Sequence, residues 1–587
     1  MKPVRLPASA TLALPRWALF ALTLLYILPG LFGRDPWKNE DASSFGIMWS
    51  LAHGGLSDWL APHIAGLAMP QEGPLAFWIG ALCIKLFGSL IGDVMASRVA
   101  TVLFFLLGAL SVWHATYVLG KRVEAQPLRL AFGGQPEARD YGRTLADGAL
   151  LIYLGLLGLL AHSHSSGAGA LHVSLMAFVL YAAVQLFDTG SLRMAAMLGL
   201  GLGASVLTRG YVAPAAIAAG LLALAVLKNR KICQHLLLIS LPLALLLPGL
   251  WAAAATAIQP FGRLPVSEWL AWNSRMLGWP SWEPMKYFLK NGIWFAWPAW
   301  PFASWAVYAW RKQFSALHIA LPLMFVNLIA FLVLLAPTFD EKILLPMLPP
   351  LAILAAFGLP TMKRGAINAV DWFSVMTLTT CAAFIWLGWV AKQTGWPAQL
   401  ARNAFKLAPG FKPEFGWIAF LTAAAATAAW FVIVHWRLSR RPQVLWRAVV
   451  LSSGGVILCW LLLMTLWLPW GNFMKSYAGV AQQIAGSLPA TANCVDTDVG
   501  PAQRASFAFF GAIPFHRADD AGAIHTTGTT GTTNATRCDF LLLQDKNRQD
   551  SADEPRLLRD GARWKLLWEG RRASDRDERF RLYERLK

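Results

Sequence analysis

The side chains best suited to chemistry lie directly after the first apolar segment of the chain. They are acidic and basic and share one stretch: Arg34, Asp35, Lys38, Glu40, Asp41 and, farther on, Glu72. A carboxylate at a membrane boundary can accept the proton of an attacking hydroxyl group or help to hold a divalent metal. We expect Glu40 to be the catalytic base, with Asp41 as the second candidate. The plainer alternative is a solvated pair, or an N-cap for a helix that starts near Ala42.

Two later cations could hold an anionic group of a substrate. Arg209 lies in the run LTRGYVAP and Lys342 in the run FDEKILLPMLPP, each beside a long apolar segment. A cation next to a phosphate stabilises it as a leaving group, and arginine can do so with two parallel hydrogen bonds. We therefore expect Arg209 and Lys342, together with Glu72, Arg34 and Lys38, to bind substrate. The alternative for the two cations is anchoring of a helix end at the membrane surface.

The histidines do not form a complete set of metal ligands. His162 and His164 have the spacing of a ligand pair and His172 follows them, but no second cluster completes the set. We predict packing roles for all three and no histidine-based metal site. A divalent ion held by the acidic pair stays open. Arg98 is expected to pair with a loop carboxylate in a structural role.

Most of this chain must lie in a membrane. Of its 587 residues 56% are hydrophobic and only 14% are charged, and the mean hydropathy is +0.47. A spanning helix needs roughly 20 apolar residues, and such windows recur nearly to Trp470. We predict about 13 spans, at 14–33, 94–119, 144–162, 168–187, 192–207, 211–227, 235–257, 291–310, 315–337, 343–360, 369–391, 414–435 and 448–470. The predicted fold class is an all-α polytopic membrane protein with a small C-terminal periplasmic α/β domain.

The placement of lysine and arginine sets the predicted orientation. If the N-terminus is cytoplasmic, the basic loops all lie inside, as the positive-inside rule requires: 121–143, 228–231, 311–312, 363–364 and 437–447. The first apolar segment has no small-residue cleavage site after it, so we expect a retained signal anchor. The chain is then a multi-pass protein of the bacterial inner membrane.

Two segments need separate treatment in this topology. The apolar segment 75–91 contains Lys85 and must lie along the membrane surface, because a further crossing would move the basic loops outside. The loop with Lys392, Arg402, Lys406 and Lys412 is an exception, since it falls on the outer side. We interpret it as a short amphipathic surface helix.

A soluble domain is predicted after the last span. We divide the chain into a transmembrane domain, 1–470, with a first periplasmic loop at 34–93, and a periplasmic domain, 471–587. Short apolar runs alternate with turn residues in the second domain, and a Thr- and Gly-rich loop is expected at 526–536. Whether Cys494 and Cys538 form a disulfide is left open.

The net charge of +19 lies mostly in the membrane part of the chain, because the part from Gly471 onward has 17 Lys and Arg and 15 Asp and Glu. No nucleic-acid partner is therefore expected.

The segments GRDPWKNEDASSFG and QEGPLAFW resemble the first extracytoplasmic loop of polyprenyl-phosphate-sugar-dependent glycosyltransferases, nearest to the lipid A aminoarabinose transferases and protein mannosyltransferases. The acidic pair of that family is usually Asp-Glu, whereas here it is Glu40-Asp41. Glu72 matches the family's Glu-Lys-Pro-Pro run, but Gly73 replaces the lysine that is thought to contact the lipid phosphate. LTRG and FDEKILLPMLPP resemble two further segments of the family, so Arg209 and Lys342 are candidates to replace that lysine.

The resemblance implies a membrane glycosyltransferase that moves a sugar from a polyprenyl-phosphate donor, such as an undecaprenyl phosphate sugar, with inversion. The acceptor is lipid A, lipopolysaccharide, another envelope glycan or a protein, and membrane lipids surround the chain. Two alternatives remain, a non-enzymatic carrier or transporter of the lipid-linked sugar and an assembly scaffold that works through its tail. A transporter typically has ionisable groups near mid-membrane, whereas Glu40, Asp41, Glu72, Arg209 and Lys342 all map to the outer side of the predicted topology.

Overall fold

A computed structural model gives the architecture of the chain. It describes residues 4–12, 14–69, 72–131, 133–257, 264–337, 340–439, 445–516, 538–546, 563–575 and 577–586. The expected Thr- and Gly-rich loop at 526–536 lies outside these ranges.

Helices form almost all of the part before residue 476. In the described ranges they are α1 (Arg16–Ile27), α2 (Glu40–His53), α3 (Leu56–Leu60), α4 (Leu75–Ile91), α5 (Asp93–Lys121), α6 (Ala138–Leu154), α7 (Leu157–His162), α8 (Ala168–Thr189), α9 (Leu192–Arg209), α10 (Val212–Lys228), α11 (Arg230–His235), α12 (Leu241–Ala257), α13 (Leu264–Ser274), α14 (Trp282–Phe295), α15 (Ala299–Ala309), α16 (Leu317–Leu334), α17 (Leu348–Ala356), α18 (Arg364–Thr394), α19 (Ala398–Leu407), α20 (Trp417–Ser439), α21 (Arg447–Leu466) and α22 (Leu468–Lys475). The predicted helical membrane fold is confirmed.

The predicted number of spans is not confirmed. Among the described residues, eight helical segments are long and apolar enough to cross a membrane. Two predicted spans are each divided between two helices: 144–162 between α6 and α7, and 291–310 between α14 and α15. The first predicted span is a helix of only 12 residues, α1. At 1.5 Å per residue such a helix is shorter than the apolar core of a bilayer.

Small residues bring the central helices close together. α5 packs against α4, α6 and α8. Where α5 and α6 cross, a Cβ atom built on Gly120 would lie 2.9 Å from the Cα atom of Gly142. This spacing leaves no room for a larger side chain, and close backbone approach of this kind stabilises helix pairs in membranes.

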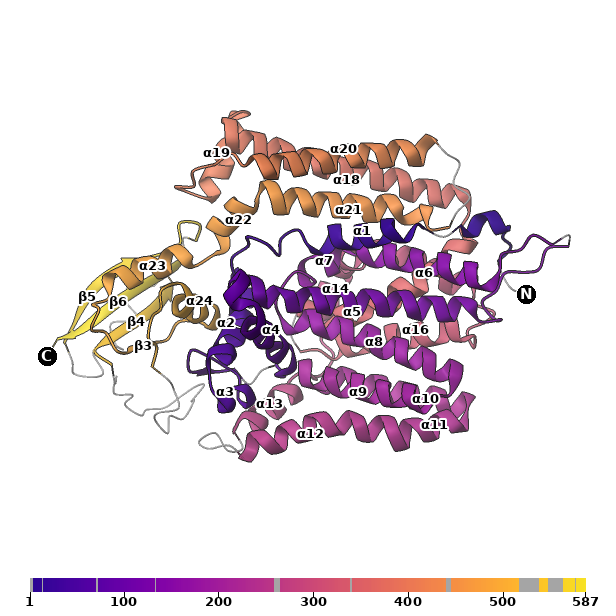
Figure 1. Ribbon diagram of the computed structural model, residues 1–587, viewed down its shortest axis with the longest axis horizontal. Helices are drawn as coiled ribbons and strands as arrows, with labels where there is room; N and C mark the ends of the chain where they lie inside the picture. Colours follow the sequence, from indigo (N-terminus) through magenta and orange to yellow (C-terminus); the bar gives the residue numbers. More distant parts are fainter. Residues whose placement is uncertain are drawn as a thin grey trace.

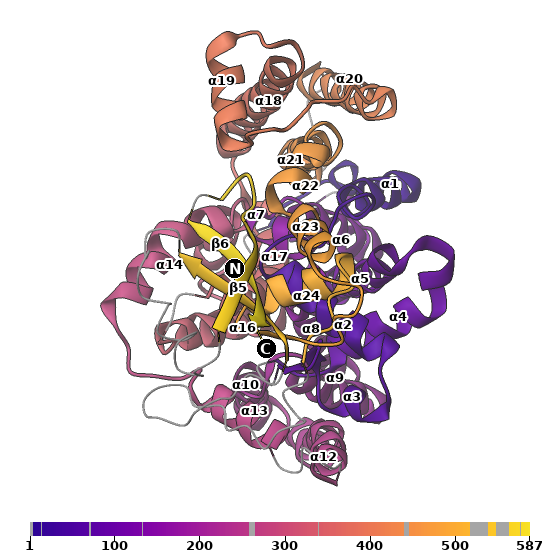
Figure 2. The ribbon, with the colours of Figure 1, turned by 90° about the vertical axis from the view of Figure 1, so that its left-hand side faces the viewer.

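The two ends of the bundle are different. The N-terminus lies at one end, and the C-terminal part of the chain lies at the other (Figure 1). α2 and α4 lie at the end near the C-terminal part, where they run across the direction of α5 (Figures 1 and 2). This arrangement supports the expectation that 75–91 follows the membrane surface.

The C-terminal unit combines a four-stranded sheet with two helices. Its elements are α23 (Ala478–Ser487), β3 (Val495–Thr497), α24 (Pro501–Phe510), β4 (Phe540–Lys546), β5 (Arg563–Gly570) and β6 (Glu578–Leu586). The strand order is β3-β4-β6-β5, with β3 parallel to β4 and the other pairs antiparallel. A disulfide joins Cys494 to Cys538. Sheet and helices share a buried core that includes Tyr477, Phe507 and Phe580, so the predicted α/β character is confirmed.

The C-terminal unit packs directly on the helix that begins with the acidic pair. α24 contacts α2, and the two backbones are so close that a Cβ atom on Gly46 would overlap the side chain of Ala505. The guanidinium of Arg504 also donates to the backbone oxygen of Ala65, at 2.7 Å. Ala65 lies between the short strands β1 (His63–Ile64) and β2 (Leu67–Ala68). The unit therefore helps to fix the position of α2.

Candidate active site

Three distant segments meet at the ammonium group of Lys342. Its Nζ atom lies 2.7 Å from Glu40 Oε1 and 3.6 Å from Glu72 Oε1. Glu40 is the first residue of α2, Glu72 lies just before α4, and Lys342 lies in a short 3₁₀ turn, Glu341–Ile343. The side chains of all three are partly exposed. One cation between two carboxylates leaves groups of both signs available to a substrate.

Arg209 joins this cluster through Asp340. Arg209 is the last residue of α9, and its guanidinium forms an ion pair with the Asp340 carboxylate. The other oxygen of Asp340 accepts a hydrogen bond from the Lys342 backbone N–H, at 2.9 Å. Burial acts to raise the pKa of Asp340, but Arg209 and this hydrogen bond outweigh it and leave the pKa below its ordinary value. Asp340 is therefore ionised at neutral pH and holds both cationic residues in place.

At Glu72 the effect of desolvation on the pKa is larger than that of the nearby cations. Desolvation raises the pKa of its carboxyl group above the ordinary value, although Lys342 and Arg209 act to lower it. Glu72 is thus more easily protonated than a solvated glutamate. A carboxyl group with a raised pKa beside two cations can bind a polar group or exchange a proton.

Asp41 has a different environment from its neighbour Glu40. Its Oδ2 atom lies 3.2 Å from Arg34 Nη2 and 3.0 Å from Arg98 Nη2, and its Oδ1 atom accepts the Ser166 backbone N–H at 2.9 Å. Burial opposes ionisation, but Arg98, Arg34 and the Ser166 hydrogen bond lower the pKa of Asp41 to about 2. Asp41 is therefore charged at neutral pH and buried, and Arg98 has the structural pairing expected for it.

Arg34 and Lys38 also bond to protein groups. Arg34 is buried, and it donates to the backbone oxygen of His164 at 2.5 Å as well as to Asp41. Lys38 is exposed and lies 3.1 Å from Asp575 of the C-terminal unit. These contacts tie the loop before α2 to the bundle on one side and to the C-terminal unit on the other.

The glycine at position 73 is required by the path of the chain. Its N–H donates to the backbone oxygen of Thr208 at 3.2 Å, and a Cβ atom built on it would overlap the backbone oxygen of Leu207. A lysine side chain, as in the resembling family, cannot be placed here without moving one of the two segments. The segment that excludes it ends in Arg209, so a cation is present two residues beyond the close contact.

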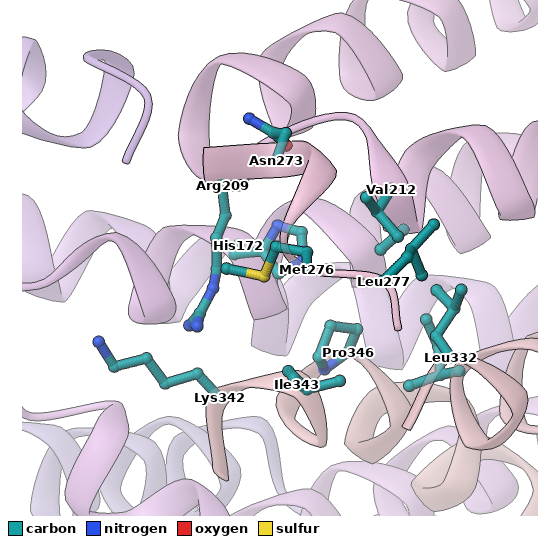
Figure 3. Close-up of a pocket in the computed structure, with 12 residues that line it drawn as sticks. His172, Arg209, Val212, Asn273, Met276, Leu277, Leu332, Lys342, Ile343 and Pro346 are labelled. Atoms are coloured by element: carbon teal, nitrogen blue, oxygen red, sulfur yellow. The ribbon is translucent and has the colours of Figure 1, made fainter. Parts of the chain in front are cut away.

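A cavity opens beside Arg209 and Lys342. It has an empty volume of about 500 Å³, part of which is open to solvent. The charged ends of Arg209 and Lys342 lie toward one side of it, whereas Val212, Leu277 and Leu332 lie toward the other (Figure 3). The site thus has a cationic end and an apolar wall. These two parts are complementary to the charged headgroup and the apolar chain of an anionic lipid.

Several residues near the site were not predicted from the sequence. Glu341 accepts a hydrogen bond from the Tyr287 hydroxyl group at 2.7 Å and lies 3.8 Å from His162 Nε2. Asn273 lines the cavity, and its side-chain oxygen accepts the Tyr211 N–H at 3.1 Å. The adjacency of Glu341 to Lys342 was a usable signal, but nothing local marked Tyr287 or Asn273.

The histidines named as possible metal ligands, His162, His164 and His172, lie in different surroundings. His172 lines the cavity and lies 3.1 Å from the Ser205 hydroxyl group. His164 is buried next to the backbone oxygens of Tyr26 and Leu160, at 2.8 and 2.6 Å, so it has a packing role. These positions do not bring the three histidines together as ligands.

Among the described residues, those around Glu40 do not form a three-ligand metal site. Within the described ranges, the group of three possible ligands that lies close enough is Asp496, His516 and Cys538 in the C-terminal unit. Cys538 is already bonded to Cys494, so it offers no thiolate.

The comparisons with known proteins include a curated relative and two solved structures of similar fold. No protein-family model matches the chain. Over 198 residues it is 26% identical to the undecaprenyl phosphate-alpha-4-amino-4-deoxy-L-arabinose arabinosyl transferase of Pseudomonas savastanoi pv. phaseolicola, a match that spans 33% of this chain and 32% of that relative. The crystal structures of ArnT from Cupriavidus metallidurans, apo and bound to undecaprenyl phosphate, superpose with TM-scores of 0.63 and 0.64 at 16% and 15% identity. Each superposition covers 96% of this chain and 97% of ArnT. The chain is a multi-pass membrane protein with the fold of ArnT.

Proposed function

We propose that this protein is an integral-membrane glycosyltransferase that moves a sugar from a polyprenyl-phosphate donor to an acceptor in the cell envelope. The observation that carries the proposal is the cavity in which Arg209 and Lys342 face an apolar wall, with Glu40 2.7 Å from Lys342. A polyprenyl phosphate has the same two parts, a charged phosphate and an apolar chain. The curated relative uses an undecaprenyl phosphate sugar, and one of the ArnT structures holds undecaprenyl phosphate.

Each residue of the site then has a role in binding or chemistry. Arg209 and Lys342 hold the donor phosphate and stabilise it as it leaves. Glu40 is the general base, because it faces this cluster and keeps a partly exposed side chain. Glu72 contacts the sugar or the acceptor beside Lys342. Asp41, Arg34 and Arg98 position α2, and Lys38 ties the loop to the C-terminal unit, so these four act through Glu40 rather than on the substrate.

The reaction is a single displacement at the anomeric carbon. An acceptor hydroxyl group attacks that carbon while its proton passes to a Glu40 oxygen, and the bond between the carbon and the donor phosphate oxygen breaks. The electron pair leaves with the polyprenyl phosphate, which departs as an anion and needs no general acid. Attack opposite the leaving group inverts the configuration. An acceptor phosphate, already ionised, would attack without the base.

The proposed function also requires that the site face the outer side of the membrane. With the basic loops in the cytoplasm, the site, the loop 34–93 and the domain 471–587 face the periplasm. The disulfide between Cys494 and Cys538 supports this side, because such bonds persist in oxidising compartments. The acceptor is lipid A, lipopolysaccharide, another envelope glycan or a protein. The absence of the family lysine at Gly73 leaves the identity of the sugar to experiment.

The test is transfer of labelled sugar from purified polyprenyl-phosphate sugars to envelope acceptors in membranes. We expect the native protein to transfer label and the Glu40→Gln variant to lose at least a hundredfold in rate, the scale of a general base. The matched control is Glu137→Gln, an exposed glutamate that precedes α6, which should transfer at the native rate. Loss of transfer in Glu40→Gln alone supports the catalytic role. A native protein that binds the donors but transfers from none would favour a lipid-linked-sugar carrier instead.

A further inference from the structure

The segment between α18 and α20 is an amphipathic surface at one end of the bundle. α19 places Leu400 and Ala404 on one side and Arg402 and Lys406 on the other, as the helical period of 3.6 residues requires. Ala401 and Ala408 are buried, whereas Leu400, Phe405 and Leu407 remain exposed. α19 is thus only partly covered by the protein, and its uncovered apolar side chains need another partner.

The same segment is strongly basic. From 392 to 417 it contains four cations and one carboxylate, Glu414. Arg402, Lys406 and Lys412 are exposed, and in the part of the chain that the structure describes none of them forms an ion pair. Three cations without protein partners favour an anionic partner from outside the chain.

Two exposed tryptophans lie at the ends of this surface. Trp396 is 71% exposed and Trp417 is 68% exposed, at the two ends of the segment. Phe415 connects Trp417 with Trp389 of α18, at ring distances of 4.8 and 5.7 Å. Tryptophan prefers the boundary between acyl chains and headgroups. Trp396 and Trp417 therefore favour a position of this segment at that boundary.

The surface is held in a fixed orientation. Lys392 is buried, and its Nζ atom donates to the backbone oxygen of Leu466 at 3.2 Å while it lies 4.9 Å from the Trp467 ring. Phe411 contacts Phe473 of α22 at a ring distance of 5.4 Å. α19 lies at the end of the bundle where the C-terminal unit lies, away from the N-terminus (Figure 1). By the proposed orientation this is the outer end, where the positive-inside rule predicts few cations.

We propose that this surface, formed by Trp396, Leu400, Arg402, Phe405, Lys406 and Lys412, binds the phosphate groups of anionic bilayer lipids in the outer leaflet. Lys and Arg attract anionic headgroups while the exposed apolar side chains enter the acyl boundary, which is how amphipathic helices bind a membrane surface. The exception to the positive-inside rule then has a physical reason. This inference does not depend on the glycosyltransferase reaction.

The test is hydrogen exchange of the backbone amides of 396–412 in nanodiscs of phosphatidylcholine alone or mixed with phosphatidylglycerol. We expect exchange to slow several-fold with the anionic lipid in the native protein, and high salt to reverse the effect because it screens the charges. The triple variant Arg402→Gln, Lys406→Gln, Lys412→Gln should lose the response. The matched control is Arg193→Gln, Arg230→Gln, Lys231→Gln, three exposed cations near the other end, which should keep it.

Two results would overturn the proposal. One is equal exchange of 396–412 in both lipid mixtures for the native protein. The other is slowing that requires an added phosphorylated acceptor glycolipid and does not occur with phosphatidylglycerol, which would assign the surface to the acceptor instead. If the triple variant fails to fold, the salt titration of the native protein decides the question alone. None of these readouts uses transferase activity, so their failure is separate from failure of the proposed function.

Discussion

Two adjacent carboxylates show how environment divides roles at the scale of single residues. Glu40 is partly exposed and is held by one cation, Lys342. Asp41 is 7% exposed and is held by two guanidinium groups and the backbone N–H groups of Ser166 and Trp37. A base must exchange a proton with the substrate, so the exposed Glu40 suits that role. The buried Asp41, with its pKa near 2, suits an electrostatic anchor.

The Asp41→Asn variant should lose stability as well as activity. Removing this carboxylate leaves Arg34 and Arg98 buried without their charge partner, a change that typically costs about 3–5 kcal/mol. We expect a lower midpoint of thermal unfolding in detergent at pH 7. Glu40→Gln is the control, because its site is partly exposed and its unfolding midpoint should stay near the native value.

The pH dependence of this effect has a definite sign. The pKa of Asp41 is lowered to about 2 in the folded protein, against about 3.9 in an unfolded chain. Its contribution is therefore fully present above about pH 4 and is lost as the pH falls toward 2. The native unfolding midpoint should fall more steeply than that of Asp41→Asn between about pH 4 and 3, roughly the upper half of this window. Parallel curves would contradict the assignment.

At the scale of elements, α22 holds the loop that carries the acidic pair. The Asn472 side-chain oxygen accepts the Asp35 N–H at 3.1 Å and the Trp37 indole N–H at 2.9 Å. Its amide nitrogen donates to the Gly33 oxygen at 2.8 Å. The Lys475 oxygen also accepts the Lys38 N–H, at 3.0 Å. The last helix before the C-terminal unit is thus a template for the loop before α2.

The Asn472→Ala variant removes three of these hydrogen bonds at once. At about 1 kcal/mol each, the loop loses enough stabilisation to misplace Glu40, so kcat for transfer should fall on the order of tenfold to a hundredfold. Hydrogen exchange of 33–41 should accelerate in the same variant. Asn229→Ala is the control, since the Asn229 side chain accepts the Lys231 N–H at the start of α11 and not a group of the loop before α2. Unchanged exchange in 33–41 would refute the template role.

At the scale of the whole molecule, the helical bundle and the C-terminal unit meet around α2. α24 packs on α2, Arg504 reaches Ala65, and Lys38 reaches Asp575. The loop with the proposed base therefore lies between two folded parts, and its geometry depends on both. The C-terminal unit therefore contributes to the geometry of the proposed active site.

The disulfide of the C-terminal unit tests both its stability and its location. It joins residues 44 apart, and closure of such a loop stabilises a fold by about 4 kcal/mol in the chain-entropy model. In the Cys494→Ser, Cys538→Ser variant, this unit should unfold at a lower temperature than in the native protein. Alkylation of intact cells before lysis should leave both native cysteines unlabelled and linked, as mass spectrometry can show. Labelled Cys494 and Cys538 would place the unit in a reducing compartment and reverse the proposed orientation.

The sequence was sufficient to predict the helical membrane fold because its signals are local. A bilayer accepts only apolar, internally hydrogen-bonded segments, so long apolar runs must become helices. The change in composition near Gly471 likewise predicted a small α/β unit, although α22 runs across the predicted boundary. The number of spans was not predictable in the same way, since breaks such as that between α6 and α7 depend on packing rather than on hydropathy.

What the sequence by itself determined is the membrane fold, the acidic pair after the first apolar segment and the cations at helix ends. Only the tertiary structure decided that Glu40 and not Asp41 faces Lys342, that the backbone at Leu207 leaves no room for a side chain at Gly73, and that Asn472 binds the loop before α2. The physical reason is distance along the chain. Such contacts join residues hundreds of positions apart, and they arise from the packing of whole helices, on which a local pattern of residue types carries no information.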